Sequence, residues 1–163
     1  MAADIFLKMS PIKGESRDSK HKDEIEVLGW SWGATNKGSA HRGGGAGSSK
    51  VEVHDLTLQK YADTSSTDLY LACCSGKHFD EALLTVRKAG GDNPVEYMKI
   101  TMNEVFVSKI ESGPHLRDSD HLTENVSLNF AKVKIEYTPQ DEKGAAGATM
   151  TMGWNIAENV KAG

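Results

Sequence analysis

Residues 122–130 alternate between apolar and polar side chains almost without exception. Four of the even positions are apolar, Leu122, Val126, Leu128 and Phe130, whereas every odd position carries Thr, Asn or Ser. Successive side chains of a β-strand point to opposite faces, so this pattern predicts a strand with one buried face. The same period of two residues recurs in several other segments. The sequence therefore predicts an all-β protein.

Seven segments follow this period, some with irregularities: 4–9, 24–35, 50–60, 82–88, 95–110, 122–137 and 150–156. The apolar parity changes near Val27–Gly29 and again near Ala131–Lys132, and a one-residue shift of this kind is typical of a β-bulge. The segment 95–110 has apolar residues at the even positions Met98, Ile100, Met102, Phe106 and Ile110. Together the segments predict a mainly β fold, a single sandwich-like β-barrel of about seven or eight antiparallel strands.

One short helix is expected at Ser65–Ser75. Ser65 or Ser66 can cap its N-terminus, and Gly76 can take the left-handed conformation that ends it. A single apolar cluster predicts one buried side, formed by Leu69, Leu71, Ala72 and Cys73. Adjacent cysteines seldom form a disulfide, so Cys73 and Cys74 are interpreted as two small buried helix residues.

Length and composition restrict the classes of function. The chain of 163 residues fits one domain, 1–163, and a hydrophobic fraction of 38% with 26% charged residues is ordinary for a soluble protein. A net charge of −4 gives no electrostatic reason to expect nucleic acid or an anionic membrane as partner. The N-terminus has no basic region followed by a long apolar core, so we expect no signal peptide. We expect the protein to be made in the cytoplasm and to be exported only by a dedicated machine.

Three motifs of ligand-binding sites are incomplete in this sequence. The glycine-rich run before Lys50 ends in Ser-Lys-Val and leads into a strand, so it does not predict a phosphate-binding loop. A calcium loop beginning at Asp118 would lack the glycine at its sixth position and the glutamate at its twelfth. His115 and His121 have no obvious third metal ligand nearby. We therefore expect no metal and no cofactor.

Catalysis by a Ser-His-Asp set is not indicated, because no Gly-x-Ser-x-Gly elbow occurs. A β-barrel hydrolase that uses His78 or His121 is the alternative function left open.

The segment Trp30-Ser31-Trp32 allows two interpretations. Both tryptophans share one strand face, and Ser31 points the opposite way. In the first interpretation the tryptophans belong to the core and the exposed serine is incidental. In the second, the serine face lines a shared surface on which small polar groups matter.

The segment Ala34–Ser49 is rich in glycine and longer than most loops of compact domains. Loops of this length are usually functional or disordered. It predicts a long loop protruding from the barrel.

Ten segments in register resemble the haemolysin-coregulated protein (Hcp) family, the tube subunit of bacterial type VI secretion systems. The resemblance covers essentially the whole chain. The segments are Lys13–Ser16, Val27–Gly33, His41–Gly47, Lys50–Leu56, Cys74–Phe79, Leu84–Gly91, Val95–Tyr97, Leu122–Phe130, Tyr137–Gln140 and Gly153–Asn155.

The resemblance implies a structural protein, not an enzyme. Its subunits would form homo-hexameric rings that stack head to tail into a hollow tube, inside a contractile sheath and beneath a spike protein. Effector proteins would travel in the lumen, where the resemblance places Ser31. Stacking of the rings is expected of the glycine-rich loop, with candidate residues Lys37, Gly38, Ser39, Ala40, His41, Arg42, Gly43, Gly44 and Gly45.

Overall fold

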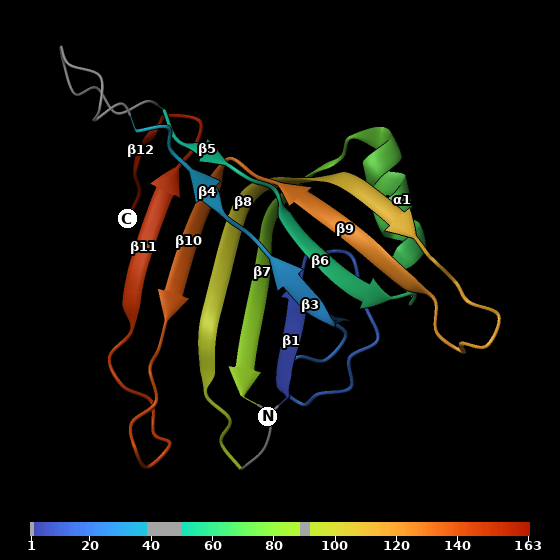
Figure 1. Ribbon diagram of the computed structural model, residues 1–163, viewed down its shortest axis with the longest axis horizontal. Helices are drawn as coiled ribbons and strands as arrows, with labels where there is room; N and C mark the ends of the chain where they lie inside the picture. The colour runs from blue at the N-terminus through green and yellow to red at the C-terminus, as the bar shows by residue number, and fades with distance from the viewer. Residues whose placement is uncertain (1, 39–49, 89–91) are drawn as a thin grey trace.

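The computed structural model describes residues 2–38, 50–88 and 92–163, and Figure 1 shows the arrangement of its elements. These ranges contain twelve β-strands and one α-helix, α1 (Ser66–Ser75). The strands are β1 (Ala3–Lys8), β2 (Ile25–Glu26), β3 (Gly29–Ser31), β4 (Ala34–Thr35), β5 (Glu52–Val53), β6 (Leu56–Tyr61), β7 (His78–Lys88), β8 (Glu96–Ser112), β9 (Thr123–Asn129), β10 (Lys132–Tyr137), β11 (Met150–Asn155) and β12 (Val160–Lys161).

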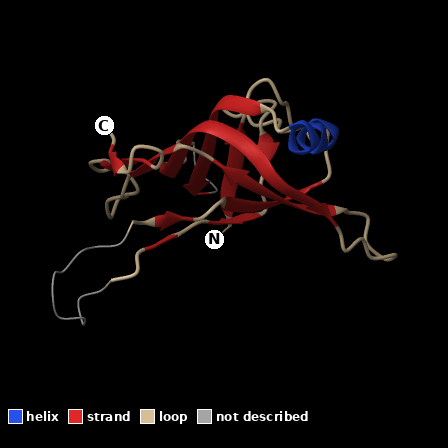
Figure 2. Ribbon diagram, turned by 90° about the horizontal axis from the view of Figure 1, so that it is seen from above, coloured by secondary structure: helices blue, strands red, loops and turns tan. Residues whose placement is uncertain are grey.

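The predicted fold class is confirmed, because the described chain is mainly β, with antiparallel pairing and one short helix. Ten strands belong to one sheet, and β4 and β5 form a separate hairpin. The strands outnumber the seven or eight expected, because several predicted strands are divided into shorter ones. Figure 2 shows α1 on the outside of the curved sheet.

Hydrogen bonds follow a closed circuit through the segment 25–31. β2 pairs with β1, and β3 pairs with β6. Between them the Val27 N–H donates to the Ile5 carbonyl at 2.9 Å, and the Leu28 N–H donates to the Gln59 carbonyl at 2.7 Å. The circuit continues from β6 through β9, β8 and β7 back to β1. A barrel closed in this way pairs the edges that an open sheet exposes.

Three strands extend the sheet beyond the barrel. The first part of β8 pairs with β7 and with β10, and the sheet continues through β11 to β12. In Figure 1 these strands stand at one side of the molecule, away from α1. One face of β10 and β11 therefore lies on the same side of the sheet as the barrel, and the opposite face points to solvent.

The core is formed by inward side chains that face one another across the ladders. Leu7 lies opposite Leu84, and Leu84 lies opposite Ile100. On the other side of the barrel, Leu58 lies opposite Val126. All five side chains are buried, as the period of two residues predicts.

The predicted strand 24–35 is three strands, not one strand with a bulge. Its parity change falls where the chain leaves β1 as pairing partner and joins β6. The second predicted bulge, near Ala131, is likewise a break between β9 and β10. A change of partner shifts the parity in the same way as a bulge, so sequence alone does not separate the two.

The predicted even parity of 95–110 is correct up to Met102 and again at Ile110, which lies opposite Val126 and packs against the core, but it is wrong between them. Glu104 has a φ of +53°, and beyond it the buried positions are odd, Val105 and Val107. A left-handed residue is uncommon outside glycine, and this one reverses which face of β8 points inward.

Helix α1 begins at Ser66 and ends before Gly76, which has a φ of +66° as predicted. Ser65 precedes the helix, but its side chain bonds Asp63 and caps no helical N–H. Leu69 and Ala72 are buried, whereas Leu71 is exposed, so the prediction for Leu71 was wrong. The prediction of two buried cysteines was also wrong, because Cys73 is half-buried and Cys74 is exposed. The buried positions are three residues apart, and Leu71 lies on the other side of the helix.

A fully buried ion pair closes one end of the core. Lys60 and Glu124 are directly opposite each other on β6 and β9, with 0% and 2% of their surfaces exposed. The Lys60 Nζ lies 2.7 Å from the Glu124 carboxylate and 3.1 Å from that of Asp63. The Ser66 hydroxyl donates to Glu124 at 3.0 Å, which attaches the start of α1 to this pair. Sequence analysis missed the pair, because a charged residue on the core parity of a strand is usually exposed.

Replacing Glu124 with Leu is expected to lower the free energy of unfolding by about 3 kcal/mol, because a buried ammonium loses its main partner. Asp63 remains near Lys60 and limits the loss. The double variant Lys60→Met, Glu124→Leu is expected to regain most of that stability, since no buried charge is left. Urea unfolding followed by circular dichroism measures both.

The matched control is Glu111→Leu, which removes the acid of the exposed pair between Lys109 and Glu111. This change is expected to cost less than about 1 kcal/mol. A double variant no more stable than the Glu124→Leu protein would contradict the argument.

Candidate assembly and cargo surfaces

Ser31 points away from the core, on the face opposite two packed tryptophans. Trp30 lies opposite Leu58 and packs against the core. The Trp32 ring is tilted against Phe130, 6.2 Å between centroids, and its Nε1–H donates to the His54 carbonyl at 2.8 Å. Ser31 is exposed. Both tryptophans therefore pack against the core, as both interpretations of this segment predicted. The Ser31 side chain lies on the exterior of the barrel.

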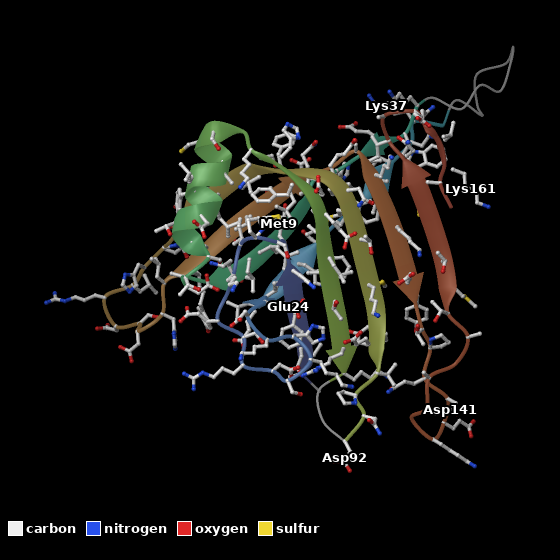
Figure 3. All side chains as sticks on the ribbon, turned by 180° about the vertical axis from the view of Figure 1, so that it is seen from behind. Met9, Glu24, Lys37, Asp92, Asp141 and Lys161 are labelled. Carbon is white, nitrogen blue, oxygen red and sulfur yellow. The ribbon has the colours of Figure 1, made fainter. Side chains whose placement is uncertain are left out.

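The glycine-rich loop leaves the body from the β4–β5 hairpin. Ala34 pairs with Val53, and Thr35 pairs with Glu52. Lys37 and Gly38 follow β4 and are exposed. Figure 3 places Lys37 at the end of the molecule away from Asp92 and Asp141, which lie in turns at the opposite end. The remaining candidate stacking residues lie outside the described residues: Ser39, Ala40, His41, Arg42, Gly43, Gly44 and Gly45.

An apolar strip lies exposed on the sheet extension. Tyr137, Met150 and Met152 are 43%, 68% and 48% exposed, and Tyr137 lies directly opposite Met150 across the β10–β11 ladder. We call these three residues the apolar strip. They continue the inward face of the sheet beyond the point where the barrel covers it.

The outer edge of β11 is mostly unpaired within the described residues. Strand β12 pairs only with Trp154 and Asn155, which leaves the stretch from Met150 to Met152 without a ladder partner on that side. The sequence correctly predicted that Met150 and Met152 share a face with Trp154. It did not reveal their exposure, because alternation identifies a face but not what covers it.

A cluster of ion pairs attaches the segment 13–24 to the barrel. The Arg87 guanidinium donates to Asp4 at 3.1 Å and to Asp18 at 3.0 Å, and it lies 5.0 Å from the centre of the Phe6 ring. The His21 ring also stacks on the Phe6 ring, with 4.3 Å between the two ring centroids. Asp4, Phe6, Asp18 and Arg87 line a cavity of about 600 Å³. The charge of Arg87 is engaged with those of Asp4 and Asp18.

The same contacts shift the pKa values of two carboxyls. The hydrogen bond from Arg87 is the main cause that lowers the pKa of Asp18 from 3.8 to about 2, and desolvation opposes it. Burial raises the pKa of Glu96, but hydrogen bonds from His21 and Lys99 outweigh it and hold that pKa below its usual value. The bond with Asp18 raises the pKa of Arg87 further. All three shifts favour the charged forms, as in a structural ion-pair network.

The alternative hydrolase hypothesis used His78 or His121, and each of these rings packs against an aromatic side chain. His78 packs its ring against Phe106, 5.5 Å between centroids, and His121 stacks on Tyr61 at 4.5 Å. A triad histidine needs a carboxylate at one nitrogen and a nucleophile at the other. These aromatic contacts supply neither.

In the described ranges, no three His, Cys, Asp or Glu side chains are grouped to hold a metal ion. Within the same ranges, the helix α1 is neither long enough nor apolar enough to cross a membrane.

Comparison with known proteins identifies relatives over nearly the whole chain. The family model "Type VI secretion system effector, Hcp" matches residues 6–137. The protein hcp1 of Pseudomonas aeruginosa is 52% identical over 163 residues, which are 99% of this chain and 100% of that protein.

Solved structures agree with this relationship. A structure described as a type six secretion system protein is 32% identical, with a TM-score of 0.92, over 99% of this chain and all of that one. Hcp1 from Salmonella typhimurium is 39% identical, with a TM-score of 0.82, over the same shares of the two chains.

The contact between Arg87 and Asp18 predicts a pH dependence of stability. The folded-state pKa of Asp18 lies below the ordinary value of 3.8, so this contact stabilises the protein fully above about pH 4. The contribution is lost as the pH falls toward 2. An Asp18→Asn protein is therefore expected to melt below the wild type at pH 5, and the gap is expected to close as the pH falls to about 2. Thermal unfolding at several pH values measures the gap.

The matched control is Asp80→Asn, which changes an exposed carboxyl near the end of β7 opposite to Arg87. Its melting temperature is expected to follow that of the wild type at every pH. A gap that stays constant with pH for Asp18→Asn would contradict the argument.

Proposed function

Since the chain belongs to the Hcp family of type VI secretion proteins, we propose that it is the structural subunit of the inner tube of that system. Six copies of the single domain 1–163 close into a ring, and rings stack head to tail. A contractile sheath surrounds the tube, a spike protein caps it, and effector proteins occupy its lumen. The observation that carries this proposal is the apolar strip beside an unpaired strand edge, in a chain related to Hcp proteins over its whole length.

The apolar strip supports a contact between subunits. Exposed contiguous apolar side chains on a soluble protein usually mark an interaction site. The open edge of β11 beside them offers backbone N–H and C=O groups to a neighbouring chain. This surface lies at one side of the molecule, so a neighbour binds it with a different surface of its own. Such heterologous contacts close into a ring when the rotation between subunits allows it.

The protein is expected to be a homo-hexamer by native mass spectrometry at micromolar concentration. Met152→Glu places a charge in the centre of the apolar strip and is expected to convert most rings to monomers. The matched control is Leu116→Glu, the same change at an exposed apolar residue of the loop before β9. Hexamers that survive Met152→Glu would remove the strip from the interface, and a wild type that is monomeric or dimeric would contradict the proposal.

The glycine-rich loop is assigned to stacking between rings. Its attachment to the β4–β5 hairpin lies at one end of the molecule, and the turns at Asp92 and Asp141 lie at the other (Figure 3). A head-to-tail stack needs different groups at these two ends. The run of residues from Lys37 to Gly45 contains four glycines and three basic or potentially basic side chains, and it adds no large apolar residue to the core.

Replacing residues 38–47 with a short turn is expected to leave hexamers intact and to abolish tube formation. The hairpin that carries the loop pairs independently of its length, so the barrel is not expected to change. Native mass spectrometry reports the rings, and electron microscopy reports the tubes. Tubes of normal length from the shortened protein would assign the loop another role.

Ser31 is assigned to the wall of the lumen. Its exposure on the outer face of the barrel is compatible with this position. In a ring, six copies would form a girdle of hydroxyl groups, and several weak contacts to one trapped cargo would give avidity. As a member of this secretion system, the protein would be made in the cytoplasm and leave through the type VI machinery, and its partners would include neither nucleic acid nor a membrane.

A further inference from the structure

Ser31 belongs to a row of polar side chains that crosses three strands. On β6 its direct neighbour is Thr57, and the neighbour of Thr57 on β9 is Ser127. The hydroxyl oxygens of Thr57 and Ser127 are 3.1 Å apart, and Ser127 is largely buried. Ser127 therefore positions Thr57, whose second hydrogen-bonding site remains open to the exterior.

A second row runs beside the first. Gln59 on β6 lies opposite Asn125 on β9, and both side chains point outward. Gln59 is exposed and Asn125 is half-buried. We call the outward side chains of Ser31, Thr57, Gln59 and Asn125 the neutral strip.

The outward face of these three strands has no charged residue. The side chains that point outward from β3, β6 and β9 belong to Gly, Ser, Thr, Gln, Asn and Tyr: Gly29, Ser31, Thr57, Gln59, Tyr61, Thr123, Asn125, Ser127 and Asn129. The only charged residues of β6 and β9 are Lys60 and Glu124 of the buried pair, and both point inward.

Charges next to the neutral strip are already engaged. On β8, Lys109 lies opposite Ser127 and Glu111 opposite Asn125, and these two charges pair with each other at 3.3 Å. At one end, the carboxylate of Asp55 accepts hydrogen bonds from Ser108 at 2.6 Å and from Asn129 at 2.8 Å.

The rest of the barrel and its extension differ in this respect. The outward positions of β1, β7, β8 and β10 carry many ionised side chains: Asp4, Lys8, Glu81, Arg87, Lys99, Lys132, Lys134 and Glu136. Among the strands of the barrel, the neutral surface is thus confined to the wall that contains Ser31. In the extension, the outward positions Thr151 and Gly153 of β11 are also uncharged.

We propose that the neutral strip is the cargo-recognition surface, with Thr57, Gln59 and Asn125 as contact residues beside Ser31, and that it selects uncharged polar groups of a polypeptide. This inference rests on the proposed tube function, which makes this wall the lumen. Hydroxyl and amide side chains donate and accept, so they pair with backbone amides and with Ser, Thr, Asn and Gln side chains without requiring one sequence. Direct and water-mediated bonds of this kind are individually weak, which allows a cargo to be released.

Binding to such a surface is expected to be nearly independent of salt. Contacts between exposed charges weaken as ions screen them, whereas bonds between neutral groups do not. A carrier that used its charged surfaces would show the opposite behaviour.

The experiment uses purified wild-type rings and three synthetic peptides of equal length. The first is a repeat of Gly-Ser-Asn-Gln, and the other two replace each Gln by Lys or by Glu. Saturation-transfer difference NMR, which detects weak binding, gives the dissociation constants at about 0.1 M and about 1 M NaCl, where the Debye lengths are about 10 Å and 3 Å.

The neutral peptide is expected to bind at least as tightly as the charged peptides, with less than about a twofold change across this range of salt. Thr57→Val removes the hydroxyl and keeps the shape, and it is expected to weaken binding by about two- to tenfold, the value of one neutral hydrogen bond. Thr101→Val is the matched control, because Thr101 points outward on the charged wall, opposite Lys134. It is expected to leave binding unchanged.

Four outcomes would each overturn the inference. The rings could prefer a charged peptide, or fail to bind the neutral one. Binding could depend strongly on salt, or the two Thr→Val changes could have equal effects. Failure of the inference is distinguishable from failure of the tube function. Native mass spectrometry of the same samples reports whether rings form, and the neutral strip lies within one subunit, so a monomeric protein also presents it to the peptides.

Discussion

The long strand β8 is the constraint on which the rest of the structure depends. It is hydrogen-bonded to β7 along one edge and to β10 and then β9 along the other. One strand therefore belongs both to the barrel and to the extension that carries the apolar strip. The left-handed residue Glu104 lies between these two parts, close to where β8 changes its neighbour. A single polar residue in an uncommon backbone conformation thus joins two parts of the sheet with opposite inward parities.

Sequence periodicity predicted the strands well where each has one partner on either side. Strand β9, the end of α1 at Gly76 and the outward direction of Ser31 all follow from local patterns, because alternation and helix termination depend on neighbouring residues. The pattern was less informative where the chain changes its pairing partner. The division of 24–35 depends on contacts with Ile5 and Gln59, residues distant in the sequence, and no local pattern records them.

Burial was predicted less well than direction. Glu124 and Met152 both occupy inward positions, yet the charged residue is enclosed and the apolar one is exposed. The reason is that Lys60 and Ser66 surround Glu124 in the folded barrel, whereas the barrel does not extend over Met152. The neutral strip follows the same rule. Each of its residues is polar and unremarkable in sequence, and only the strand register makes Ser31 and Thr57 neighbours.

The two-residue strands β4 and β5 have a consequence for how the chain can vary. Their pairs fix the two ends of the intervening segment, from Asn36 to Val51, at one place on the body. The entropy of closing a loop grows only with the logarithm of its length, so each doubling costs about 0.6 kcal/mol. Insertions and deletions between these ends therefore change the stability of the barrel very little. Barrel stability therefore places little restriction on the length of this segment, and the restriction that remains comes from assembly.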